Sequence, residues 1–153
     1  MTNWNQVQLE LKGLIEGDDD RVSVLANTSA LIYEHMPNLN WCGFYWINPQ
    51  DVLVLGPFQG KTACTRIPIG EGCCGGAVCQ ARILRVADVH QYEGHIACDS
   101  ASQSEIVVPI YMKGQIVGVL DIDSPLLNRF TDEDEKGLKG CVDILGAHLE
   151  TIQ

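Results

Sequence analysis

Two acidic residues at the end of an apolar segment constrain the fold of this chain most strongly. Residues 115–123 read QIVGVLDID, which is typical of a buried β-strand except for its acids. Because side chains alternate along a strand, one face carries Val117, Val119, Asp121 and Asp123. The two carboxylates then stand about 6.5 to 7 Å apart among valines. An ionised carboxylate in such surroundings needs a cation or a proton, so we interpret this face as part of a binding pocket.

A cysteine precedes this acidic strand in a long polar segment. Residues 87–104 are too polar and too rich in glycine for a core element, and a loop of that length in a compact domain is usually functional. Cys98 lies in this loop, and Glu105 follows it at the start of the next apolar strand. A thiol close to an acidic pocket is a candidate catalytic site.

Length and charge limit the classes of function. The chain has 153 residues, of which 46% are hydrophobic, and this predicts one domain over residues 1–153. Ten basic residues against twenty acidic residues give a net charge of −10, which disfavours nucleic acids and anionic membrane surfaces as partners. The first residues lack the pattern of a signal peptide, and no apolar run reaches the roughly 18 residues of a membrane span. We expect a cytoplasmic protein.

The seven cysteines are an odd number and therefore cannot all be paired. In a reducing compartment this favours reactive thiols among buried ones over a disulfide scaffold. No Cys-x2-Cys pair occurs, so we expect no structural zinc site and no metal. Three cysteines lie in apolar periodic segments and are expected to be inert core residues: Cys42, Cys79 and Cys141.

Hydrophobic periodicity predicts an α+β fold. Helices are expected over residues 7–15 and 22–35, the second capped by Asp20, and a third is expected to begin at Thr131. Strands are expected over residues 41–47, 52–55, 62–67, 83–86, 105–112 and 115–123, with Cys64 inside the third strand. The order predicts an antiparallel sheet of about six strands with the N- and C-terminal helices packed on one face.

Several sequence motifs extend over nearly the whole chain. They are LANTSA at 25–30, WCGFY at 41–45, LGPFQGK at 55–61, GCCG at 72–75, GHIACD at 94–99, SEIV at 104–107 and GVLDID at 118–123. Together they resemble the free methionine-(R)-sulfoxide reductases, which are single GAF domains. The resemblance implies a GAF-like domain that reduces free methionine-(R)-sulfoxide to methionine. It also implies three working cysteines, which match Cys64, Cys74 and Cys98 here.

The residues supply the chemistry that such a reaction needs. Reduction of a sulfoxide requires a thiolate to attack sulfur while an acid protonates the oxygen. We expect Cys98 to be the nucleophile and Cys64 or Cys74 to be the resolving thiol that condenses with the resulting sulfenic acid. The working disulfide is thus Cys64 to Cys98 or Cys74 to Cys98, and Cys73 adds a thiol beside Cys74. Thioredoxin is the expected reductant, and no cofactor is required.

The acids and two aromatic residues complete the expected site. Glu105, Asp121 and Asp123 are expected to neutralise the ammonium group of the free amino acid. One of the three can instead stay protonated, because a like-charged neighbour raises its pKa, and can serve as the proton donor. Trp41 and Tyr45 share one face of their strand and are expected to form the wall on the methyl-sulfoxide side of the substrate.

Two other classes of function stay open at this point. A GAF domain without catalysis is usually a small-molecule sensor, although sensors commonly lie in longer chains. A general thiol redox sensor would use the cysteines but would have no use for an acidic pocket. The expected partners are the free sulfoxide, thioredoxin and a second copy of the chain in a homodimer.

Overall fold

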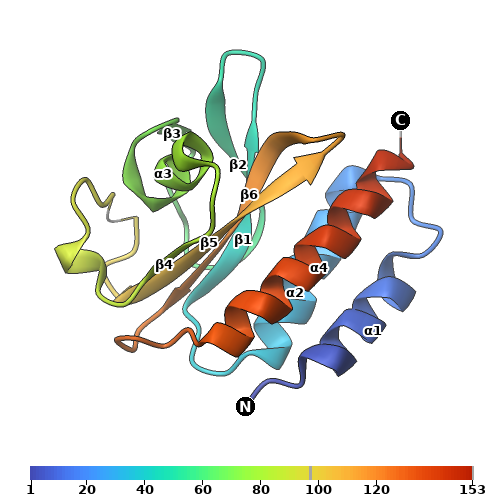
Figure 1. The fold of residues 1–153 in the computed structure, drawn as a ribbon, viewed down its shortest axis with the longest axis horizontal. Coiled ribbons are helices and arrows are strands. Elements are labelled where there is room, and N and C mark those ends of the chain that lie inside the picture. Colours follow the sequence, from blue (N-terminus) through green and yellow to red (C-terminus); the bar gives the residue numbers. More distant parts are fainter. Residues whose placement is uncertain (97, 153) are drawn as a thin grey trace.

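The computed structural model describes residues 1–96 and 98–152. Its elements, shown in Figure 1, are α1 (Trp4–Ile15), α2 (Arg21–His35), β1 (Trp41–Ile47), β2 (Val52–Gly60), β3 (Arg66–Pro68), α3 (Gly72–Gln80), β4 (Leu84–Val86), a short 3-10 helix η1 (Val89–Gln91), β5 (Ser104–Met112), β6 (Gln115–Ser124) and α4 (Asp132–Glu150). None of the described helices is both long enough and apolar enough to cross a membrane.

The strands form one antiparallel sheet in the order β3-β2-β1-β6-β5-β4. The predicted hairpin between β5 and β6 is confirmed, and its two turn residues, Lys113 and Gly114, both have positive φ, as a tight hairpin turn requires. Because β1 pairs with β6, strands from the two ends of the chain lie side by side at the centre of the sheet. This pairing brings the segment around Trp41 next to the acidic end of β6.

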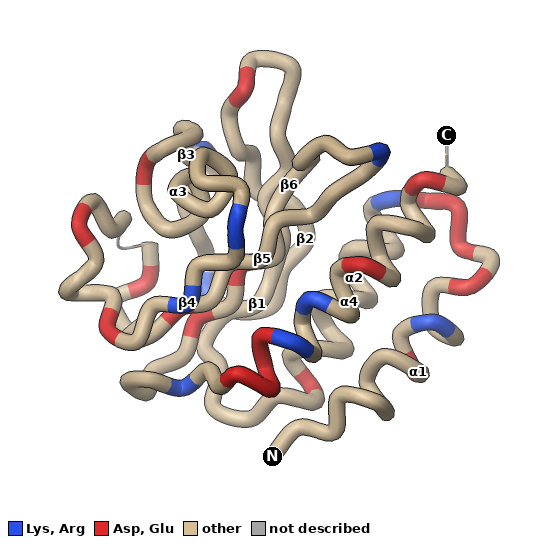
Figure 2. Tube along the Cα trace, viewed as in Figure 1, with Lys and Arg blue, Asp and Glu red and all other residues tan. Residues whose placement is uncertain are grey.

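Three helices cover one face of the sheet, which confirms the predicted arrangement. In Figure 1, α1, α2 and α4 lie together on the same side. Helices α2 and α4 pack against the sheet, and α1 packs on these two helices to complete the main hydrophobic core. Figure 2 shows acidic residues in the turn before α2 and in the first turn of α4. Asp20 caps the N-terminus of α2, and Thr131 forms a capping box with Asp134 at the N-terminus of α4. Acidic residues are also favourable at these positions because the N-terminus of a helix carries a partial positive charge.

The opposite face is covered by the short helix α3 and forms a second, smaller core. Helix α3 consists mainly of small residues, and these allow it to lie very close to its neighbours. A Cβ atom on Gly75 would come within 2.4 Å of the Pro68 carbonyl oxygen, and one on Gly76 within 2.6 Å of the Tyr92 hydroxyl. Glycine at these two positions therefore fixes the distance between α3 and the rest of this face.

Two predicted strands differ from the observed ones. Strand β2 continues to Gly60, opposite Trp41, because its ladder with β1 resumes after an irregularity between Gly43 and Tyr45. The expected strand over residues 62–67 is wrong, since β3 includes only Arg66–Pro68 and Cys64 lies in the loop before it. The Cys64 carbonyl accepts a hydrogen bond from the Tyr45 hydroxyl at 2.9 Å, so a side chain satisfies it.

Candidate active site

The three acids meet on the face that α3 covers. Asp121 and Asp123 project from β6, and Glu105 on β5 is the direct ladder partner of Asp123. Glu105 and Asp121 are each only 6% exposed. Asp121 Oδ1 and Asp123 Oδ1 are buried and have no hydrogen-bond partner among the described residues. Buried acceptors without partners are costly, so these oxygens favour a donor or a proton.

Burial changes the protonation of all three acids. It raises the pKa of Glu105 and of Asp123 well above the usual range, and the nearby charge of Asp121 adds to both shifts. Burial also raises the pKa of Asp121, although less strongly. Three carboxylates this close to one another cannot all stay ionised unless a cation lies among them. The cluster therefore retains at least one proton at neutral pH when no cation is bound.

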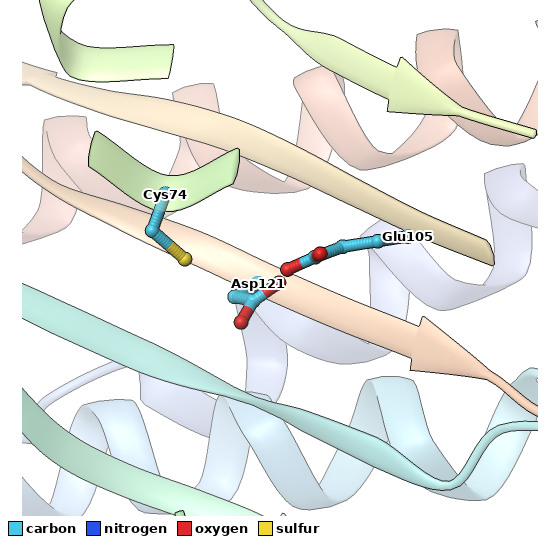
Figure 3. Close-up of side chains that lie close together, drawn as sticks. All are labelled: Cys74, Glu105 and Asp121. Carbon is cyan, nitrogen blue, oxygen red and sulfur yellow. The ribbon is translucent and has the colours of Figure 1, made fainter. Parts of the chain in front are cut away.

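Two thiols from the start of α3 lie against these acids. Figure 3 shows the Cys74 side chain pointing from α3 toward Asp121, with the Glu105 carboxylate close to the same point. Burial raises the pKa of Cys73 to about 12 and that of Cys74 well above its usual value, and the carboxylates raise the latter further. Both groups are therefore neutral thiols at physiological pH, which makes them weak nucleophiles.

The donor atoms of Cys74, Glu105 and Asp121 all lie within 4.8 Å of one another. A thiol and two carboxylates at this spacing are close enough to share one cation, whether a metal ion or the ammonium group of a ligand. No Lys or Arg is among the described residues that line the adjacent cavity. The cluster thus lacks a protein cation of its own, and this favours a positively charged ligand.

A disulfide joins the two loops at the mouth of the site. Cys64 and Cys98 are bonded, with their Cα atoms 5.6 Å apart, and this is one of the two pairings that the sequence left open. Five other cysteines remain free, and among them only Cys79 is exposed. The cavity beside it measures about 30 Å³, which is room for roughly two water molecules. With the disulfide formed, the site has no room for a ligand the size of an amino acid.

Aromatic side chains form the opposite wall. The Trp41 and Tyr45 rings are stacked with centroids 5.9 Å apart, and both line the cavity. Trp41 also stacks on Phe58 at 5.2 Å, and its indole N–H donates to the Lys61 carbonyl at 3.1 Å. Gly43 lies against the Trp41 and Phe58 side chains and has no space for a side chain of its own, since a Cβ atom there would lie 2.3 Å from the Cβ atom of Phe58. The aromatic wall is therefore rigid.

The structure adds polar residues that the sequence did not single out as site residues. Ser102 is only 5% exposed, and its hydroxyl donates to Asp123 Oδ2 at 3.0 Å. Asn40 donates to Asp99 and Ser102, both at 3.0 Å. His95 Nε2 lies 3.8 Å from Glu105 Oε1, and burial lowers the pKa of His95, so its neutral form is favoured. Nothing in the local sequence distinguishes such loop residues from solvated ones.

Comparison with known proteins shows which family has this arrangement. The GAF domain family matches residues 18–149. The chain is 54% identical to the free methionine-R-sulfoxide reductase of Escherichia coli (strain K12), with 94% of this chain and 84% of the relative covered. The chain therefore belongs to the free methionine-R-sulfoxide reductases, which are part of the GAF domain family.

Two solved structures extend the likeness to the fold of free methionine-R-sulfoxide reductases. The Neisseria meningitidis free methionine-R-sulfoxide reductase, solved in complex with its substrate, is 41% identical with a TM-score of 0.93, and 96% of this chain and 88% of that chain are covered. The Staphylococcus aureus fRMsr, also in complex with substrate, is 47% identical with a TM-score of 0.93, and 97% of each chain is covered. The predicted resemblance and α+β fold are thus confirmed.

Proposed function

We propose that this chain reduces the free amino acid methionine-(R)-sulfoxide to methionine, with Cys98 as the nucleophile. The observation that carries the proposal is the position of the Cys64–Cys98 disulfide next to the buried carboxylates of Glu105 and Asp121 and the partly buried one of Asp123. The disulfide supplies two-electron chemistry, and the carboxylates supply a site for an ammonium group and a proton. Family membership supports the same reaction.

In the first step, the thiolate of reduced Cys98 attacks the sulfur of the sulfoxide. This attack forms a bond between the two sulfur atoms, which breaks again together with the sulfur–oxygen bond as the protonated oxygen moves to Cys98. The substrate sulfur has then gained two electrons and leaves as methionine, and Cys98 is a sulfenic acid. A carboxylic acid of the cluster protonates this oxygen as negative charge develops on it. Glu105 and Asp123 are suited to this role, because burial raises the pKa of both acids.

In the second step, Cys64 attacks the sulfenic acid, so that the disulfide forms and water leaves. The observed bond between Cys64 and Cys98 supports Cys64 as the resolving thiol. Cys74 is less suited to this attack, because its raised pKa leaves almost no thiolate at neutral pH. A dithiol protein, thioredoxin, then returns two electrons and two protons to the enzyme. We place this cycle in the reducing cytoplasm, and a homodimer stays a prediction.

Substrate recognition follows from the charges of the cluster. The ammonium group of the amino acid would lie among Glu105, Asp121 and Asp123, where it would give the unpartnered carboxylate oxygens their missing donors. The methyl-sulfoxide end would contact Trp41 and Tyr45. Because the cavity of the disulfide form measures only about 30 Å³, the substrate binds after reduction has freed the Cys98 side chain from Cys64.

A coupled assay tests this function. The protein is incubated with thioredoxin, thioredoxin reductase, NADPH and free methionine sulfoxide, and NADPH consumption is measured with the (R) and (S) epimers separately. We expect consumption with the (R) epimer and none with the (S) epimer. No methionine from the (R) epimer, with either thioredoxin or dithiothreitol as the reductant, would overturn the proposal and favour a sensor.

A further inference from the structure

Asn40 connects the loop that carries Cys98 with the acidic end of β6. Its backbone N–H donates to the Asp123 carbonyl at 3.0 Å, which extends the pairing of β1 with β6 by one residue. Its side-chain amide donates two further hydrogen bonds, to Asp99 Oδ2 and to Ser102 Oγ, each of 3.0 Å. Asp99 directly follows Cys98, so one amide group contacts the loop at two points beside the thiol.

The chemistry of the partners fixes the orientation of this amide. Hydrogen bonds from the Ala101 backbone N–H and from Asn40 lower the pKa of Asp99, so this carboxylate is ionised and only accepts. The NH2 group of Asn40 must therefore face Asp99. Ser102 in turn accepts from Asn40 and donates to Asp123 Oδ2 at 3.0 Å. The direction of donation thus runs from Asn40 through Ser102 to the carboxylate of Asp123.

This network and the disulfide hold the same loop in different ways. While Cys64 and Cys98 are bonded, the loop is attached covalently. If the disulfide opens, the contacts left to hold the loop are the hydrogen bonds of Asn40 and the 2.8 Å bond from the Gln103 N–H to the Ser124 carbonyl. The bond to Asp99 is charge-assisted and is therefore the strongest of these polar contacts.

We propose that Asn40 is a positioning residue that holds the Cys98 loop against β6 in the reduced enzyme. It is dispensable for this purpose while the disulfide is closed. The side-chain amide of Asn40 positions the Cys98 loop and, through Ser102, the carboxylate of Asp123. A role for Asn40 in catalysis therefore rests on the proposed function. Asn40 would thereby fix the nucleophile relative to the ammonium group of the substrate.

Amide hydrogen exchange tests the anchoring without any catalysis. Exchange at Ala101, Ser102 and Gln103, whose N–H groups all have acceptors in the structure, is compared between Asn40→Ala and the unmodified chain. In the reduced proteins we expect exchange in the variant to be faster by at least about tenfold. In the oxidised proteins we expect no difference.

Asn27→Ala is the matched control, because Asn27 is an exposed residue of α2 and should change exchange in neither state. Equal acceleration in both redox states would mean that Asn40 only stabilises the fold, and no acceleration in the reduced state would mean that it anchors nothing. Both results would overturn the proposal.

Exchanging the side chains of Asn40 and Asp99 separates the role of the Asn40–Asp99 bond from that of the Asn40–Ser102 bond, through their effects on kcat and KM. Asn40→Asp alone places two carboxylates face to face and should lower kcat by about tenfold or more. Adding Asp99→Asn restores a donor and acceptor between the same positions, and kcat should recover. In both the single and the double variant the KM should be higher than in the unmodified enzyme. In each of them Ser102 donates its hydrogen bond to the carboxylate introduced at position 40 instead of to Asp123.

Failure of the double variant to recover kcat would contradict the positioning role. An unmodified enzyme without turnover would instead contradict the proposed function, and the exchange measurements would still decide the anchoring.

Discussion

Glu105 lies directly opposite Asp123 in the antiparallel ladder between β5 and β6. Like charges at opposite positions of a ladder destabilise the sheet, and burial makes the repulsion stronger. The pair is stable only when it holds a proton or when a cation lies beside it. Stability of the empty protein and affinity for an ammonium group therefore depend on the same few atoms.

The stability of the substrate-free protein should fall as the pH rises. Glu105 has a higher pKa in the folded than in the unfolded chain, so its contribution is complete below the unfolded pKa of about 4 and is lost as pH rises through the folded value. Glu105→Gln removes this loss. We expect the variant to lose less free energy of unfolding than the unmodified protein between about pH 5 and pH 8, by on the order of 1 to 3 kcal/mol.

Urea unfolding at several pH values measures this difference. The lowered pKa of His95 acts in the opposite direction, and the difference between the two proteins reports Glu105 together with the coupled acids Asp121 and Asp123. Glu34→Gln, at an exposed position of α2, is the control and should leave the pH profile unchanged. Parallel profiles for Glu105→Gln and the unmodified protein would contradict the raised pKa of Glu105.

Cys98→Ser should abolish turnover even with dithiothreitol as the reductant. A serine hydroxyl stays protonated near neutral pH and cannot displace the oxygen of a sulfoxide. Steady-state formation of methionine measures the effect, and Cys79→Ser, at the exposed free cysteine, serves as the control with an unchanged rate. A substantial residual rate in Cys98→Ser would assign the nucleophile to Cys74.

Cys64→Ser should separate the first step from recycling. Cys98 can still take the oxygen from one substrate molecule, but its sulfenic acid then lacks the partner to which it is bonded in the structure. We expect one equivalent of methionine per enzyme in a rapid burst and no sustained turnover with thioredoxin. Unimpaired cycling in this variant would assign resolution to Cys74 or Cys73.

Acetylation of the substrate nitrogen should nearly abolish activity. The amide has no charge and leaves the carboxylates of Glu105, Asp121 and Asp123 without their cation. The loss of a desolvated charge partner costs about 3 to 5 kcal/mol, or two to four decades in rate. Rates for free and N-acetylated methionine-(R)-sulfoxide give the ratio directly. Equal rates would favour a reductase of protein-bound sulfoxides.

Periodicity was sufficient to predict most of the fold. The helical spacing of the terminal segments reflects burial on one face, and the apolar run of β6 reflects burial on both faces of the sheet; both are local properties of the sequence. The expected strand over residues 62–67 failed because contacts with distant residues decide its conformation. The Cys64 carbonyl bonds to the Tyr45 side chain and Cys64 itself bonds to the distant Cys98.

The sequence could predict a site residue only where its chemical type was unusual for the element that carries it. Acids on an apolar strand are conspicuous, and the structure brings Asp121 and Asp123 together with Glu105, as the sequence suggested. Asn40 and Ser102 could not be predicted, because their hydrogen bonds join residues 62 and 21 positions apart in the chain. Only the pairing of β1 with β6 brings these segments together.

The bond between Cys64 and Cys98 encloses a stretch of chain that includes β3, α3 and β4, the elements around the smaller core. In the proposed cycle, each turnover therefore makes and breaks a covalent ring. With its ends 34 positions apart in the sequence, such a ring restricts the unfolded chain by about 4 kcal/mol in the chain-entropy description. The lifetime of the protein in the cell would then depend on its redox state. The oxidised form, with the disulfide closed, would resist proteases longer than the reduced form.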